Sequence, residues 1–152
     1  MSQRLHLLFT QLIHDLINKT MTLQIMYEFL VDKTDLSQIS NTTKEMMDIL
    51  VLTRSLLNMN PNQEVLKKIC VNNNIDCHIA TENKTSVLIA LGLLTMDLAQ
   101  ICAIALHENK IILEYKKSSR TNTQNGIWQF LHEEYQIRWE LEKKRIIFTW
   151  GE

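Results

Sequence analysis

Ile13-His14-Asp15-Leu16-Ile17-Asn18 lies inside a segment, residues 5–30, whose apolar residues recur at helical spacing. At about 100° per residue, one side of such a helix collects Leu5, Leu8, Leu12, Leu16, Leu23, Met26 and Leu30, with Phe9 at its border. His14 falls almost opposite the centre of this stripe. The pattern therefore predicts a helix over residues 3–31 that buries its leucines. It presents the His14 imidazole, beside the Asp15 carboxylate, to water or to a partner.

A second helix is predicted over residues 35–59, after a short polar turn at 32–35. It ends before Pro61, because proline cannot continue a helix and restricts the residue before it. A turn this short makes the two helices antiparallel neighbours. The apolar stripe of the second helix consists of Leu36, Ile39, Met46, Met47, Leu50 and Leu57.

Four further apolar residues of this hairpin need something to pack on: Ile13, Val51, Leu52 and Leu56. Two identical hairpins related by a two-fold axis would bury them in a dimeric four-helix bundle. The alternative is that the hairpin packs on residues 62–152 of its own chain, as a monomer. The sequence favours the homodimer and leaves the alternative open.

After Pro61 the pattern changes to strands interleaved with helices. Helices are predicted over residues 64–70, 84–105 and 122–136, and strands over 76–81, 110–116, 137–141 and 145–150. This order predicts an α/β sandwich with helices on one face of a single sheet. The expected fold class is α+β, with a helical hairpin over residues 1–61 and a mixed domain over 62–152.

Composition narrows the functional classes. The chain has 152 residues, 45% hydrophobic and 22% charged, as in soluble globular proteins, and a net charge of -1 gives nucleic-acid binding no electrostatic support. No apolar run approaches the ~20 residues that span a bilayer. Three cysteines without metal-type spacing and the absence of a secretory leader at the start predict a cytoplasmic protein with reduced thiols.

A hairpin with His-Asp on its first helix, followed by an α/β sandwich, resembles the dimerisation and ATP-binding halves of a sensor histidine kinase. It is more closely similar to bacterial histidine phosphotransferases that look like degenerate kinases. Their helix carries a His-Asp-Leu-Ile box, read here as His14-Asp15-Leu16-Ile17. The resemblance implies a phosphorelay in which this homodimer passes phosphate between receiver domains of hybrid kinases and response regulators. Lys19 departs from the kinase-like box, which usually has proline five residues after the histidine.

The ATP-binding motifs of the kinases are missing. Their nucleotide site needs an asparagine-bearing helix and glycine-rich segments that let the backbone approach base and phosphates. The corresponding helix, residues 87–97, has no asparagine, and no Gly-x-Gly occurs in the chain. We therefore expect no ATP binding and no cofactor bound by this chain. Magnesium would be supplied by the partner receiver domain.

Within the resemblance, His14 is the phosphoacceptor, since a neutral imidazole is a competent nucleophile. Asp15 would orient the ring or take part in acid–base chemistry. Asn18, one turn later, would position water for dephosphorylation of the receiver. A partner-binding footprint is predicted on the same side of the helix, made of Ile17, Met21 and Ile25. These residues could instead fill the dimer core or touch the second domain.

Two other functions stay open. The chain could be a non-catalytic dimeric adaptor that docks response regulators, with His14 an inert surface residue. It could also be a kinase or ATPase with a disguised nucleotide site.

Overall fold

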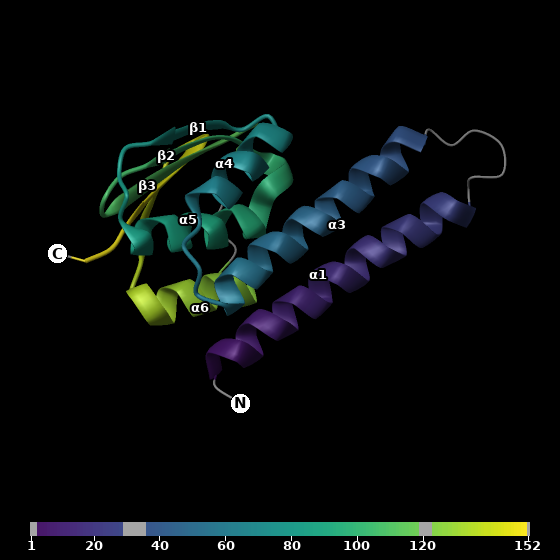
Figure 1. Ribbon diagram of the computed structural model, residues 1–152, viewed down its shortest axis with the longest axis horizontal. Coiled ribbons are helices and arrows are strands. Elements are labelled where there is room, and N and C mark those ends of the chain that lie inside the picture. The colour runs from purple at the N-terminus through teal and green to yellow at the C-terminus, as the bar shows by residue number, and fades with distance from the viewer. Residues whose placement is uncertain (1–2, 29–35, 119–122, 152) are drawn as a thin grey trace.

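Two long helices, α1 (Gln3–Glu28) and α3 (Leu36–Leu57), lie side by side and run in opposite directions (Figure 1). The computed structural model describes residues 3–28, 36–118 and 123–151. Both predicted helices are confirmed within these ranges. The predicted turn at 32–35 and Leu30 lie outside the described residues, as do the side chains of Met26, Leu36 and Ile39.

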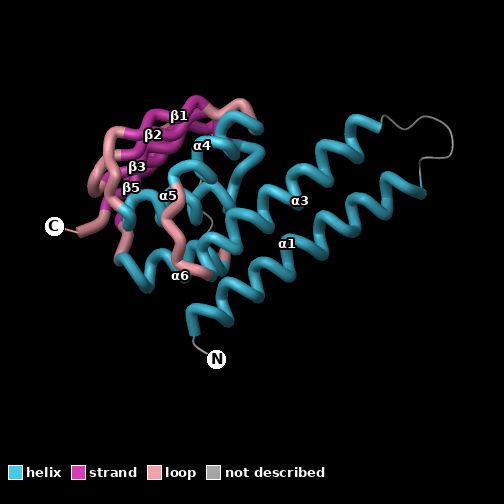
Figure 2. Tube along the Cα trace, in the orientation of Figure 1, coloured by secondary structure: helices cyan, strands magenta, loops and turns pink. Residues whose placement is uncertain are grey.

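Three shorter helices cover one face of the sheet (Figure 2): α4 (Gln63–Asn72), α5 (Lys84–Asp97) and α6 (Gly126–Tyr135). Each begins at an asparagine whose side chain accepts hydrogen bonds from backbone N–H groups of the first turn. These caps satisfy donors that a helix start leaves without intrahelical partners. Polar residues just before apolar runs therefore fix where all three helices start.

The sheet has five strands in the order β1-β2-β3-β5-β4. They are β1 (Asp76–Ile79), β2 (Ile101–Leu106), β3 (Lys110–Tyr115), β4 (Arg138–Leu141) and β5 (Arg145–Thr149). The β1–β2 pair is parallel and the other pairs are antiparallel. The α+β class is thus confirmed, together with the four strands that alternation predicted.

The predicted helix over residues 84–105 is wrong in its second half. Helix α5 ends at Asp97, a 3-10 turn covers Leu98–Gln100, and the remaining residues form the central strand β2. Every residue from Ser86 to Thr95 is buried. A helix without a polar face has no periodicity to mark its end, so an apolar strand directly after it reads as more helix.

One end of the hairpin packs into the same core as the sheet-covering helices. Leu8 of α1 and Leu52 and Leu56 of α3 are fully buried there, with α3 against α5 and α1 against α6. Leu52 and Leu56 therefore pack on the second half of their own chain, which is the alternative that the sequence left open. Ile13 and Val51 stay exposed. The other end of the hairpin projects beyond the sheet and its helices (Figure 1), and no described helix is both long and apolar enough to cross a membrane.

Candidate functional site

His14 projects from the middle of α1, and its side chain is 65% exposed. The exposure predicted from the leucine stripe is confirmed. Leu8 on the stripe is buried, and Leu12 and Leu16 are half-buried, so the core side of the helix is set by the leucines.

Both ring nitrogens of His14 have a polar neighbour on α1. Asp15 Oδ1 lies 3.4 Å from Nδ1, and Asn18 Nδ2 lies 3.4 Å from Nε2. A carboxylate only accepts hydrogen bonds and an amide nitrogen only donates. The two contacts therefore fit the neutral tautomer with its proton on Nδ1. That tautomer places the lone pair on Nε2, where Asn18 Nδ2 faces it, so an attack by Nε2 requires the Asn18 amide to turn away.

A fourth polar residue, Gln11, belongs to this group and has no counterpart in the sequence interpretation. Its amide Nε2 donates to Asp15 Oδ1 at 2.8 Å, and its Oε1 accepts from the Gly126 backbone N–H at 2.8 Å. The spacing of four residues between Gln11 and Asp15 was the available signal, because residues four apart are neighbours on a helix. The bond to Gly126 had no signal in the sequence.

Lys19, which stands where kinase-like boxes have proline, joins the two helices of the hairpin. Its Nζ lies 2.5 Å from Glu45 Oε2 of α3. Helix α1 runs unbroken through this position. The ion pair sets Lys19 opposite Glu45 in the antiparallel register, which places residues near 13 and 17 of α1 opposite residues near 51 and 47 of α3.

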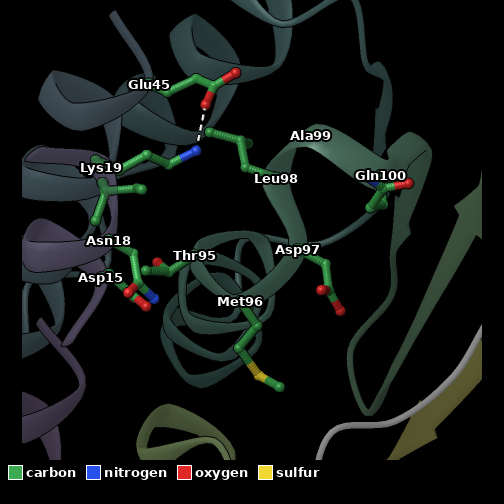
Figure 3. Close-up of a pocket in the computed structure, with 11 residues that line it drawn as sticks. Asp15, Asn18, Lys19, Glu45, Thr95, Met96, Asp97, Leu98, Ala99 and Gln100 are labelled. Atoms are coloured by element: carbon green, nitrogen blue, oxygen red, sulfur yellow. Dashed lines mark hydrogen bonds and ion pairs between the residues drawn. The ribbon is translucent and has the colours of Figure 1, made fainter. Parts of the chain in front are cut away.

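A cleft of about 310 Å³ opens beside His14, between the hairpin and the end of α5. Figure 3 shows Asp15 and Asn18 on one wall and the α5 end that carries Thr95 on the other. The remaining lining is Lys19, Glu45, Ile49, Met96, Asp97, Leu98, Ala99 and Gln100. Two of the three predicted polar site residues thus face a shared hollow, while His14 stands outside it toward solvent.

The predicted footprint residues Ile17, Met21 and Ile25 are each more than half exposed, so none is buried against the second half of the chain. With Phe9 and Ile13 they form a series four residues apart. Each step advances roughly 40° around the helix. The series therefore turns about 160° around α1 from Phe9 to Ile25, and its last members, Met21 and Ile25, lie on the same side of the helix as His14.

A pair of thiols lies away from this site. Cys70 is buried on α4, and Cys77 is half-buried on the facing side of β1. A hydrogen bond from the Cys70 thiol lowers the pKa of Cys77, against an opposing effect of burial, and nearby Lys67 adds to the lowering. The same hydrogen bond, with burial, raises the pKa of Cys70. Cys77 is the thiol that ionises first, because it is the more exposed of the two and has the lysine beside it.

We expect iodoacetamide to modify Cys77 before Cys102, which is also half-buried, and before buried Cys70. Peptide mapping over a pH series measures the three rates. Cys70→Ala removes the donor and should move the Cys77 reaction to higher pH. Equal rates at Cys77 and Cys102, unchanged in this variant, would contradict the expectation.

No group of three or more His, Cys, Asp or Glu side chains that could hold a metal ion occurs among the residues placed by the structure. The chain matches no protein-family model and no curated protein sequence with which it was compared. The chemistry of the site is therefore inferred from its own residues.

Proposed function

We propose that this chain is a histidine phosphotransferase of a bacterial phosphorelay, which carries phosphate on His14 between receiver-domain aspartates. The observation that carries the proposal is the exposed imidazole whose Nδ1 faces Asp15 and whose Nε2 faces Asn18. A solvent-facing nucleophile with a defined tautomer is what transfer from a second protein requires.

In the transfer step the Nε2 lone pair forms a bond to phosphorus while the P–O bond of the aspartyl phosphate breaks. The bonding electrons leave with the aspartate, which becomes a carboxylate. The return step reverses these changes onto the aspartate of another receiver. Positioning and charge stabilisation dominate such reactions. The receiver domain supplies the magnesium ion, and Asp15 stabilises the cationic imidazole ring that forms.

The proposal has the phosphate come from a protein rather than from ATP. Three features support this origin. Helix α5 contains no asparagine. The one glycine near the expected nucleotide loop, Gly126, packs against the backbone of α1. Between α5, α6 and the sheet, a cavity of about 10 Å³ is left among Met96, Tyr115, Trp128 and Phe148. A volume of that size does not admit an adenine ring.

The finer architecture in this proposal is a homodimer in which two hairpins form a four-helix bundle and the mixed domain is a degenerate kinase ATP-binding sandwich. Exposed apolar side chains occur on both helices of the hairpin, at Phe9 and Ile13 of α1 and at Met47, Leu50 and Val51 of α3. A two-fold axis through this apolar face would bury it in a self-complementary interface. Ile17, Met21 and Ile25 turn toward the side of α1 that carries His14 and are left for the receiver domain.

Ile13→Glu is expected to turn the dimer into a monomer, because it would bury two carboxylates near the two-fold axis. Sedimentation equilibrium of both proteins measures the change. Val71→Glu, which adds the same charge at a 75% exposed apolar position of α4, outside the hairpin, is the control and should remain dimeric. A monomeric wild-type protein would contradict the bundle.

The experiment that tests the phosphotransfer uses receiver domains labelled on aspartate with radioactive acetyl phosphate. Label should move to the wild-type chain as an acid-labile, base-stable adduct, and His14→Ala should abolish the transfer. His6→Ala, at an exposed histidine on the same helix, should transfer at the wild-type rate. Label that persists in His14→Ala would remove His14 as the acceptor.

The exposed apolar series on α1 also favours a second function, a non-catalytic adaptor that docks receiver domains. Apolar contact needs no chemistry at His14. Receiver binding that survives His14→Ala, with no labelled adduct on the wild-type chain, would support the adaptor and contradict the relay.

A further inference from the structure

We infer that Gln11 is a positioning residue for His14, which orients Asp15 by linking it to the first turn of α6. The inference rests on the proposed phosphotransfer function and adds a part to it. It joins the nucleophile on the first helix to the second half of the chain.

Both polar atoms of the Gln11 side-chain amide form a hydrogen bond. Its Nε2 donates to Asp15 Oδ1 at 2.8 Å, and the same Oδ1 lies 3.4 Å from His14 Nδ1. Its Oε1 accepts from the Gly126 N–H at 2.8 Å. The amide cannot rotate by half a turn without presenting its NH₂ to a backbone N–H and its oxygen to a carboxylate. Its orientation is therefore fixed by both partners.

The anchor at Gly126 is rigid. Asn125 caps α6, and the residues after Gly126 that hold the helix in the core are Ile127, Trp128, Phe130 and Leu131. The backbones approach so closely that a Cβ on Gly126 would lie 2.6 Å from the Leu7 carbonyl oxygen and 3.1 Å from Gln11 Cβ. Gln11 is thus held against a buried helix start, not against a loop.

Asp15 needs such help because consecutive residues on a helix do not face each other. Left alone, its carboxylate would move among rotamers, and few of them place an oxygen beside His14 Nδ1. The hydrogen bond from Gln11 selects one that does. Asp15 then holds the proton on Nδ1, so the lone pair stays on Nε2 and reaches phosphorus once the Asn18 amide turns away. Less orientation is then lost on reaching the transition state.

Gln11→Glu separates this role from packing. The glutamate has the same shape and keeps an acceptor for the Gly126 N–H, but it replaces the donor to Asp15 with a second carboxylate. We expect the rate of phosphate uptake at neutral pH to fall on the order of tenfold, the lower end of the scale for outer partners that orient functional histidines. Receiver affinity should be unchanged.

The pH profile gives a readout that packing alone would not move. A second carboxylate beside Asp15 favours the imidazolium form of His14, which is not a nucleophile. The pH at which the rate of phosphate uptake increases should therefore be higher in Gln11→Glu than in wild type. The other charged groups around the cleft stay the same in both proteins: Lys19, Glu45 and Asp97. Gln24→Glu adds an equal charge elsewhere on α1 and should keep the wild-type profile.

Nitrogen NMR of the His14 ring tests positioning without any partner protein. Wild type should show the tautomer with its proton on Nδ1, and Gln11→Glu should show less of it, because Asn18 is then the one oriented partner left among the described residues to favour it. If the tautomer changes but wild type takes up no phosphate, the proposed function fails while Gln11 still positions the ring. An unchanged tautomer, or an uptake rate and pH profile equal to wild type in Gln11→Glu, overturns the inference.

Discussion

Replacing Leu52 with alanine is expected to lower the free energy of unfolding by about 3–4 kcal/mol, because it removes a fully buried side chain and leaves a cavity. Leu52 lies on α3 with no exposed surface, in the core that α3 shares with α5. Urea unfolding followed by circular dichroism measures the loss. Since the cavity lies where the hairpin meets the rest of the chain, both should unfold in one transition.

Leu50→Ala is the matched control, two residues away on the same helix. The Leu50 side chain is 38% exposed, so its loss should cost less than about 1 kcal/mol when both leucine variants are measured in the monomeric Ile13→Glu background, where no dimer interface contributes. If Leu52→Ala cost no more than Leu50→Ala, or if the hairpin unfolded in a separate step, the shared core would be contradicted.

Periodicity could predict both long helices but not the partner of each apolar face. Leu52 and Val51 were equivalent in the sequence, since both lie beside the main stripe of α3. The structure buries the first against α5 and exposes the second. Which face meets which element depends on contacts between residues far apart, and a helical pattern contains only contacts within one segment.

The boundary between α5 and β2 shows a second limit. The side chain of Asn83 caps α5 within its own first turn, so the start of this helix is a local property. Its end at Asp97 is not, because apolar residues continue on both sides. The sheet decides the matter, since Ile101–Leu106 pairs with β1 on one side and β3 on the other.

The candidate site divides in the same way. Asn18 is four residues from His14, so helical spacing alone predicts that the two side chains meet. The ion pair of Lys19 could not be predicted from helical spacing, because its partner Glu45 belongs to another helix. The bond from Gly126 to Gln11 joins residues 115 positions apart. Local spacing therefore predicted the exposed His14 and its neighbour Asn18, while the contacts that hold this part of α1 in place required the fold.

Gly126→Ala is expected to lower the free energy of unfolding by about 1–3 kcal/mol, the cost of forcing a methyl group into a closely packed contact. The new Cβ would lie 2.6 Å from the Leu7 carbonyl oxygen, which is backbone and cannot move without shifting α1. The same shift would pull Gln11 from its anchor. Phosphate uptake on His14 should therefore fall together with stability, as urea unfolding and the labelling assay can measure.

Gly92→Ala separates this contact from a general effect of alanine. Its Cβ would lie 3.0 Å from Cδ1 and 3.1 Å from Cδ2 of Leu131, a buried side chain that needs to shift only slightly, whereas at Gly126 the obstacle is backbone. Alanine is also favoured over glycine within a helix by about 1 kcal/mol, and this gain offsets the crowding. Gly92→Ala should therefore stay within about 1 kcal/mol of wild type and keep its phosphate uptake. If the two variants lost equal stability, the close approach of α1 to α6 would not be the cause of the loss in Gly126→Ala. Gly126 would then have no role in holding the helix that carries His14.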